Sequence, residues 1–138
     1  MSRSQDPCFI LNSFPVGEKS TMLYCFTLGS GVLHLFANIT PKKKAMLRSF
    51  CKVHIDYFGS GDKKKLRNIS IESVDSSLAF KHSSWSYEVL MSAYSLNELI
   101  LKLLPKEVAD EELFFLYERS LKELDALSIL QKDNPKKD

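Results

Sequence analysis

A change in the spacing of apolar residues near residue 80 limits most strongly what this chain can fold into. Before it, short apolar or alternating runs occupy residues 8–14, 21–28, 32–39, 50–58 and 66–74. After it, apolar residues recur every three or four positions. The first pattern is typical of short strands and the second of amphipathic helices. The sequence therefore predicts an α+β fold in which a β module precedes a helical one.

Turn-forming residues separate the five runs. A Gly-Ser-Gly link at residues 29–31 predicts a hairpin. Residues 14–17 and 59–62 hold the Pro and Gly that favour turns. In the third and fourth runs, the side chains expected to face the interior are Leu33, Leu35, Ala37, Ile39, Cys51, Val53, Ile55 and Tyr57. Five short strands suit a small closed or partly closed barrel, which hides its strand edges. We assign the barrel to residues 1–78.

Residues 79–138 form the helical segment. A first helix is expected between Trp85 and Leu103, and Pro105 ends it because proline disfavours helical geometry in the residue before it. Asp110 is a suitable N-cap for a second helix, which carries an apolar stripe as far as Leu127. The short connection between them predicts an antiparallel helical hairpin.

Charge is divided between the two modules, although the whole chain carries a formal net charge of only +2. Residues 41–67 contain nine basic and two acidic side chains, whereas residues 82–131 contain four basic and nine acidic ones. A basic barrel and an acidic helical segment are therefore expected.

Several classes of function lack support in the sequence. The three cysteines are widely spaced and form no CxxC pair, so structural thiols are expected rather than a metal site or disulfides. Neither a catalytic constellation nor a phosphate-binding glycine loop occurs, which predicts a protein without enzymatic activity or cofactor. Signal-peptide and membrane-span patterns are absent, so we expect a soluble, cytoplasmic protein with no membrane contact.

Two basic clusters are the main candidate site, because lysine and arginine neutralise DNA phosphates without regard to base sequence. The candidate DNA-binding residues are Lys42, Lys43, Lys44, Arg48, Lys63, Lys64, Lys65 and Arg67. Phe36 and Phe58 fall on the polar faces of their strands and are candidates for base stacking. Tyr24, Phe26 and Tyr57 are expected in the core. The alternative for the lysines is a solvated loop that keeps the chain soluble.

The order of these features resembles the RecO family of DNA repair proteins. The motifs that carry the resemblance are Phe9-Ile10-Leu11, Gly17-Glu18, Phe26-Thr27, Gly31, Ala37, Pro41-Lys42-Lys43-Lys44, Leu103-Leu104-Pro105 and Glu112-Leu113-Phe114. The chain departs from the family at Asn38-Ile39, where members have a small basic turn, and at Ser49, where many members have proline. The family's later part, which in some members holds a four-cysteine zinc site, is missing, so a fragment or a shortened member is expected.

This resemblance implies an OB-fold followed by a helical domain that is only partly present. It also implies binding and annealing of single- and double-stranded DNA, and assistance in loading RecA, within the nucleoid. The partners implied are RecR, the acidic tail of single-strand-binding protein, RecF and RecA. A second hypothesis is a protein-interaction module whose helical hairpin docks a partner without DNA binding.

Overall fold

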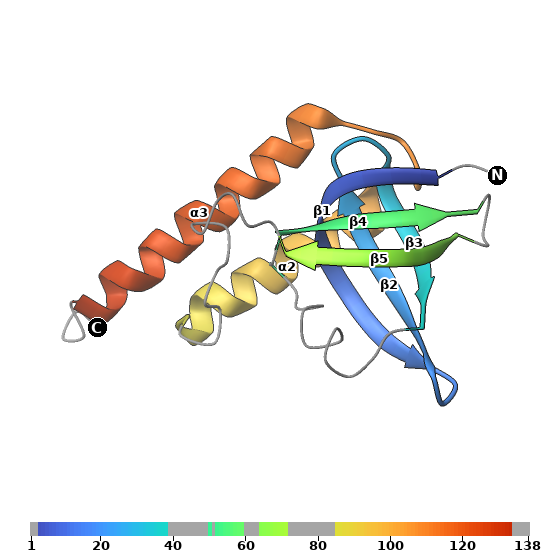
Figure 1. Cartoon of the computed structure of the whole chain (residues 1–138). Helices are drawn as coiled ribbons and strands as arrows, with labels where there is room; N and C mark the ends of the chain where they lie inside the picture. Colours follow the sequence, from blue (N-terminus) through green and yellow to red (C-terminus); the bar gives the residue numbers. More distant parts are fainter. Residues whose placement is uncertain (1–2, 39–49, 51, 60–63, 72–84, 134–138) are drawn as a thin grey trace.

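The computed structural model describes residues 3–38, 50, 52–59, 64–71 and 85–133. In chain order the elements are β1 (Arg3–Val16), β2 (Ser20–Thr27), β3 (Gly31–Ala37), β4 (Lys52–Phe58), β5 (Lys65–Ile71), α2 (Tyr87–Leu103) and α3 (Glu111–Asp133). The strands close into a barrel in the order β1-β2-β3-β5-β4 (Figure 1). The expected α+β fold, a five-stranded OB-fold-like barrel followed by a helical hairpin, is confirmed.

The long first strand closes the barrel. Its first half pairs with β4 from Arg3 to Phe9, and its second half pairs with β2 from Cys8 to Val16. An irregularity between Ile10 and Asn12 marks the bend between the halves. The sequence had predicted a break at Pro15, but the strand continues through it. At Pro15 the described pairing is with β2 alone, and proline is tolerated in strands that are paired on one side only.

The barrel interior is filled by the alternating residues expected from the sequence. Leu33, Leu35 and Ala37 of β3 and Val53, Ile55 and Tyr57 of β4 belong to one buried cluster. Cys8 and Cys25 lie in the same cluster as free thiols, as expected for structural cysteines. Cys51 and Ile39 fall outside the described residues.

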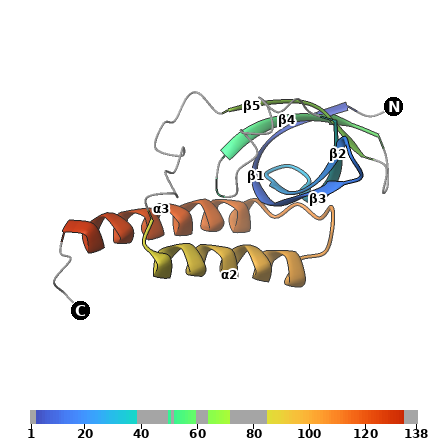
Figure 2. The same ribbon diagram turned by 90° about the horizontal axis from the view of Figure 1, so that it is seen from below.

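A second core joins the barrel to the two helices, which run antiparallel along one side of it (Figure 2). Phe9 and Phe26 point outward from the barrel and pack on Phe114 and Tyr117 of α3. Ring centroids lie 5.1 Å apart for Phe9 and Tyr117 and 5.5 Å apart for Phe26 and Phe114. Both strands therefore have a buried outer face at this point, which explains why β2 is apolar on both sides.

Phe50 was predicted to begin the fourth strand, and this was wrong. It precedes β4, has a positive φ of 71°, and is fully buried. Its ring lies 5.0 Å from that of Tyr94 and 5.4 Å from that of Trp85. Packing against the helical segment, rather than strand pairing, accounts for its apolar character.

The helix ends follow the expected signals. Ser86 caps α2 by accepting a hydrogen bond from the Val89 N–H at 3.3 Å, so the helix begins at Tyr87 rather than at Trp85. The Asp110 carboxylate accepts a bond from the Leu113 N–H at 3.0 Å at the start of α3. Pro105 lies two residues beyond the last residue of α2, which agrees with its predicted role.

Candidate nucleic-acid interface

Much of the expected DNA-binding set lies outside the described part of the chain. This applies to Lys42, Lys43, Lys44, Arg48 and Lys63. The backbone of Arg67 is described within β5, but its side chain is not. Of the predicted set, the structure therefore describes the side chains of Lys64 and Lys65. It also shows where the described chain stops and resumes on either side of the basic segments.

Three of the points where these segments join the described chain lie at one end of the barrel. The segment 39–49 follows Asn38, whose side chain accepts a hydrogen bond from Ser20 Oγ at 2.9 Å. Two residues earlier, the Phe36 N–H donates to the Lys64 carbonyl at 3.1 Å. Residues 60–63 join β4 after Gly59 and reach β5 at Lys64. The start of segment 39–49 and both ends of segment 60–63 are thus attached beside the same strand ends, whereas segment 39–49 returns to the described chain at Phe50, ahead of the opposite end of β4.

Lys65 lies between the two phenylalanines proposed for base stacking. It pairs with Phe36 of β3 on one side and with Phe58 of β4 on the other. Paired residues of neighbouring strands project from the same face of a sheet. The adjacent residues Leu35, Tyr57 and Leu66 belong to the interior cluster, so this row lies on the outside of the barrel. Lys65 is exposed, and both phenylalanines are half-buried.

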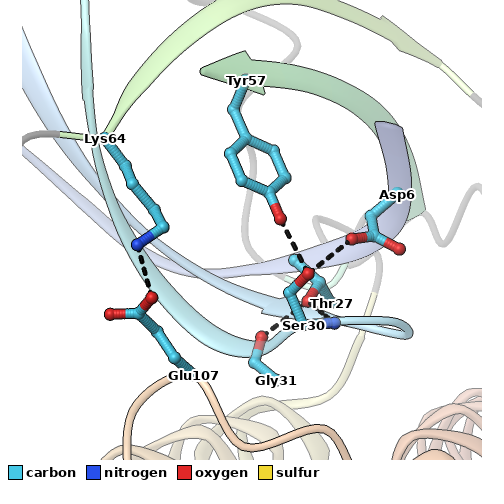
Figure 3. Close-up of polar contacts among 7 residues, drawn as sticks. All are labelled: Asp6, Thr27, Ser30, Gly31, Tyr57, Lys64 and Glu107. Atoms are coloured by element: carbon cyan, nitrogen blue, oxygen red, sulfur yellow. Dashed lines mark hydrogen bonds and ion pairs between the residues drawn. The ribbon is translucent and has the colours of Figure 1, made fainter. Parts of the chain in front are cut away.

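Lys64 is held by a carboxylate from the helical segment. Its ammonium group pairs with Glu107, in the connection between α2 and α3 (Figure 3). The Lys64 side chain is only 12% exposed, whereas that of Glu107 is 43% exposed. The Glu107 N–H also donates to the Val32 carbonyl at 2.9 Å, which fixes the connection against β3. The Glu107 carboxylate therefore competes with any phosphate for Lys64.

Lys52 also contacts the helical segment. It pairs with Glu118 of α3 at 3.1 Å and lies 5.9 Å from the centre of the Phe114 ring. The side chains of Lys52 and Glu118 are 14% and 12% exposed. The sequence placed Lys52 on an outward face and counted it toward the basic barrel. The outward position is correct, and on this face Lys52 attaches α3 to β4.

A polar network that sequence reasoning missed fixes the β2–β3 turn at the barrel mouth (Figure 3). Ser30 Oγ lies 3.0 Å from Asp6 Oδ2 and 2.7 Å from Tyr57 Oη. Asp6 Oδ1 accepts from the Gly29 N–H at 3.1 Å, and Thr27 Oγ1 accepts from the Ser30 N–H at 2.9 Å. The contacts join β1, β4 and the turn through groups distant in sequence. Their role is to hold the turn in place rather than to carry chemistry.

The aromatic residues expected in the core divide into two groups. Phe26 is 1% exposed and Tyr57 is 5% exposed, so both are core residues. Tyr24 is only half-buried, on the outer face of β2, and its ring stacks on that of His34 in β3. Tyr24 lies two residues before Phe26, so the two side chains project from the same, outer face of β2. This spacing could have predicted that Tyr24 lies outside the barrel interior. Among the other histidines, His54 is exposed as expected, and His82 lies outside the described residues.

The described residues contain no group of three or more His, Cys, Asp or Glu side chains able to hold a metal ion. Within the same ranges, none of the helices has the length and apolar character needed to cross a membrane.

Comparison with known proteins identifies relatives of the chain. No protein-family model matches it. DNA repair protein RecO of Nitrosococcus oceani is 30% identical over 122 residues, which cover 86% of this chain and 47% of the relative. RecO of Salmonella dublin is 38% identical over 113 residues, covering 79% and 44%. RecO of Ralstonia nicotianae is 30% identical over 125 residues, covering 88% and 43%. The chain spans about half the length of the curated relatives it matches.

Proposed function

We propose that this chain, a homologue of the DNA repair proteins RecO, is a non-enzymatic DNA-binding protein of recombinational repair. The residues proposed to bind the DNA backbone are Lys42, Lys43, Lys44, Arg48, Lys63, Lys64, Lys65 and Arg67. One observation carries the proposal. Lys65 lies on the outer barrel face between Phe36 and Phe58, at the end where segment 39–49 leaves β3 and segment 60–63 links β4 to β5.

The physical basis is the release of counterions from DNA. Each phosphate neutralised by lysine or arginine frees condensed cations, so binding needs no base recognition and weakens as salt rises. Lysine suits this role because its ammonium group acts as a point charge with no fixed geometry. If about six side chains met phosphates, affinity would fall roughly a thousandfold between 50 and 200 mM salt.

Annealing of complementary strands follows from the same surface if it holds two strands close together while their bases remain free to pair. We extend the proposal to assistance in RecA loading, with RecR, RecF and the tail of single-strand-binding protein as partners in the nucleoid. This extension rests on the similarity to DNA repair proteins RecO.

A second candidate function, docking of a protein partner, is favoured by the apolar side chains that the helices leave in solvent. Tyr87 is 75% exposed, Leu103 is 72% exposed and Leu130 is 59% exposed. Large exposed apolar surfaces mark interaction sites in soluble proteins. In this alternative the lysines serve solubility and DNA is not bound.

A titration of fluorescently labelled oligonucleotide at low salt separates the two functions. The test variant reverses Lys42, Lys43 and Lys44 to Glu. The matched control reverses Lys102, Arg119 and Lys122 to Glu, which changes the net charge equally but on the helices. We expect at least a tenfold loss of affinity in the test variant and a much smaller loss in the control. Equal losses, or no binding by the native chain, would refute the proposal.

A further inference from the structure

Among the described residues, the seam between β3 and β5 is the shortest in the barrel. The two strands pair only at Phe36 and Lys65, and the Phe36 N–H donates to the Lys64 carbonyl at 3.1 Å. At the other four seams the pairing runs along most of the shorter strand. Because a strand edge without a partner exposes its N–H and C=O groups, the start of β3 is where closure of the barrel needs support from outside the sheet.

The connection between α2 and α3, residues 104–110 and here called the strap, supplies this support. Lys106 forms a parallel bridge with Val32, and the Glu107 N–H donates to the Val32 carbonyl at 2.9 Å. Val32 and Phe36 have the same parity along β3, so their backbone groups point toward the same edge of the strand. The strap therefore occupies the start of the edge whose end is paired with β5.

Two backbone features show how closely the strap is fitted to β3. Gly31 has a φ of 71°, and a Cβ atom at this position would lie 2.3 Å from the Val108 carbonyl oxygen. Only glycine permits this approach. Glu107 has a positive φ of 61°, a conformation that persists outside glycine only where the surrounding contacts impose it. The docked strap is thus held by its contacts, and loss of one contact favours its release.

The contact between Glu107 and Lys64 is the one that an anion can replace. The Glu107 carboxylate reaches from the strap to the lysine that precedes β5, so the strap joins both strands of the short seam (Figure 3). A phosphate that pairs with Lys64 competes with this carboxylate for the same ammonium group. The helices keep other attachments to the barrel, such as the hydrogen bond from Asn97 to the Leu11 carbonyl. Release can therefore be confined to the strap.

We propose that the strap is an autoinhibitory closure of the barrel. When docked, it covers the start of the β3 edge and holds Lys64 with Glu107 in place of a phosphate. A polyanion that pairs with Lys64 releases Glu107 and loosens the seam between β3 and β5. The closure itself needs no ligand, whereas the release rests on the proposed DNA binding. Occupancy of Lys64 by DNA is in this way transmitted to the connection between the two helices.

Amide hydrogen exchange, followed by NMR without DNA, tests the closure. Glu107→Gln keeps the size of the side chain and removes its charge. Glu98→Gln is the matched control, because Glu98 pairs with Lys102 on the exposed surface of α2. We expect the amides of residue 107 and Phe36 to exchange about threefold faster in Glu107→Gln and at the native rate in the control. The Leu28 amide, which bonds to β1, should keep its rate in both variants.

Unchanged rates at residue 107 and Phe36 in the Glu107→Gln variant would overturn the closure. Equal acceleration at Leu28 would also overturn it, because the effect would then be a general loss of stability rather than an opening of the strap.

A thymidine oligonucleotide added at low salt tests the release. In the native chain the Glu107 amide should exchange about threefold faster with bound DNA than without it. DNA should cause no further acceleration in Glu107→Gln, where the competing charge is already gone. Bound DNA that leaves the native Glu107 amide unchanged or slows it would overturn the release. Failure of the native chain to bind DNA would overturn the proposed function and the release, while the rates measured without DNA still decide the closure.

Discussion

The hydroxyl of Tyr117 on α3 donates a hydrogen bond to the side-chain oxygen of Asn97 on α2. Asn97 in turn donates through Nδ2 to the Leu11 carbonyl in β1 at 3.2 Å. Both side chains are 2% exposed. The bulged residue of β1 is therefore connected to both helices through one buried polar pair. Since a buried polar group without a partner is costly, this pair fixes how the helices lie on the barrel.

Replacement of Tyr117 by Phe should destabilise the protein by about 1–3 kcal/mol, because it leaves the buried Asn97 oxygen without a donor. Urea denaturation measures the change. Tyr87→Phe, on the exposed face of α2, is the control and should stay within about 0.5 kcal/mol of the native chain. A Tyr117→Phe protein as stable as the control would show that the bond does not hold the helices.

Alkaline pH should weaken the fold. Burial raises the pKa of Tyr117 above its ordinary value, and the hydrogen bond with Asn97 offsets only part of this. Burial and the neighbouring Cys25 likewise raise the pKa of the Cys8 thiol. A raised folded-state pKa gives stability that is complete below the unfolded pKa and is lost above it. The free energy of unfolding should therefore begin to fall near pH 9 and fall more steeply above about pH 10.

Urea titrations between pH 7 and 11 measure this loss. Tyr117→Phe removes the ionisable phenol, so its stability should fall less steeply above about pH 10 than that of the native chain. Parallel curves for the two proteins would contradict the assignment.

The thiols of Cys8 and Cys25 should resist modification, because both are fully buried in the barrel core. The measurement is the reaction of a disulfide reagent with a Cys51→Ser variant, which leaves only these two thiols. The reaction should be slow in buffer and accelerate with urea in parallel with unfolding. Fast reaction in buffer would show that the β1–β2 side of the barrel opens.

Replacement of Glu107 by Gln should strengthen DNA binding about twofold at low salt, because it removes the carboxylate charge that competes with phosphate for Lys64. Glu98→Gln is the matched control, since Glu98 forms an ion pair with Lys102 on the exposed surface of α2 and the charge change is the same. Fluorescence anisotropy with a labelled oligonucleotide compares the two variants. Equal gains would mean that only net charge matters and that Lys64 has no separate role.

The sequence predicted those parts of the fold that depend on local alternation. The inward positions of β3 and β4 followed from parity, and the start of α3 followed from Asp110. Contacts between segments that are far apart in the sequence could not be predicted from it. The Lys52–Glu118 pair joins residues 66 positions apart, and the Tyr24–His34 stack depends on the register of two strands.

The sequence predicted which residue types form the candidate site, but not how these residues are arranged in space. Clustered lysines and outward-facing phenylalanines were visible in the sequence. That Lys65 falls between Phe36 and Phe58 depends on strand order, because β5 inserts between β3 and β4 in the barrel. That Lys64 meets Glu107 depends on where the helix connection crosses β3.

The salt dependence of DNA affinity tests the central claim most directly. Affinity for a labelled oligonucleotide would be measured from 50 to 200 mM salt for the native chain and for Lys65→Gln combined with Lys42→Gln and Lys43→Gln. A plot of log affinity against log salt should become shallower by about two to three units, depending on strand type, as three phosphate contacts are lost. An unchanged slope would contradict the claim that these ammonium groups meet the DNA backbone.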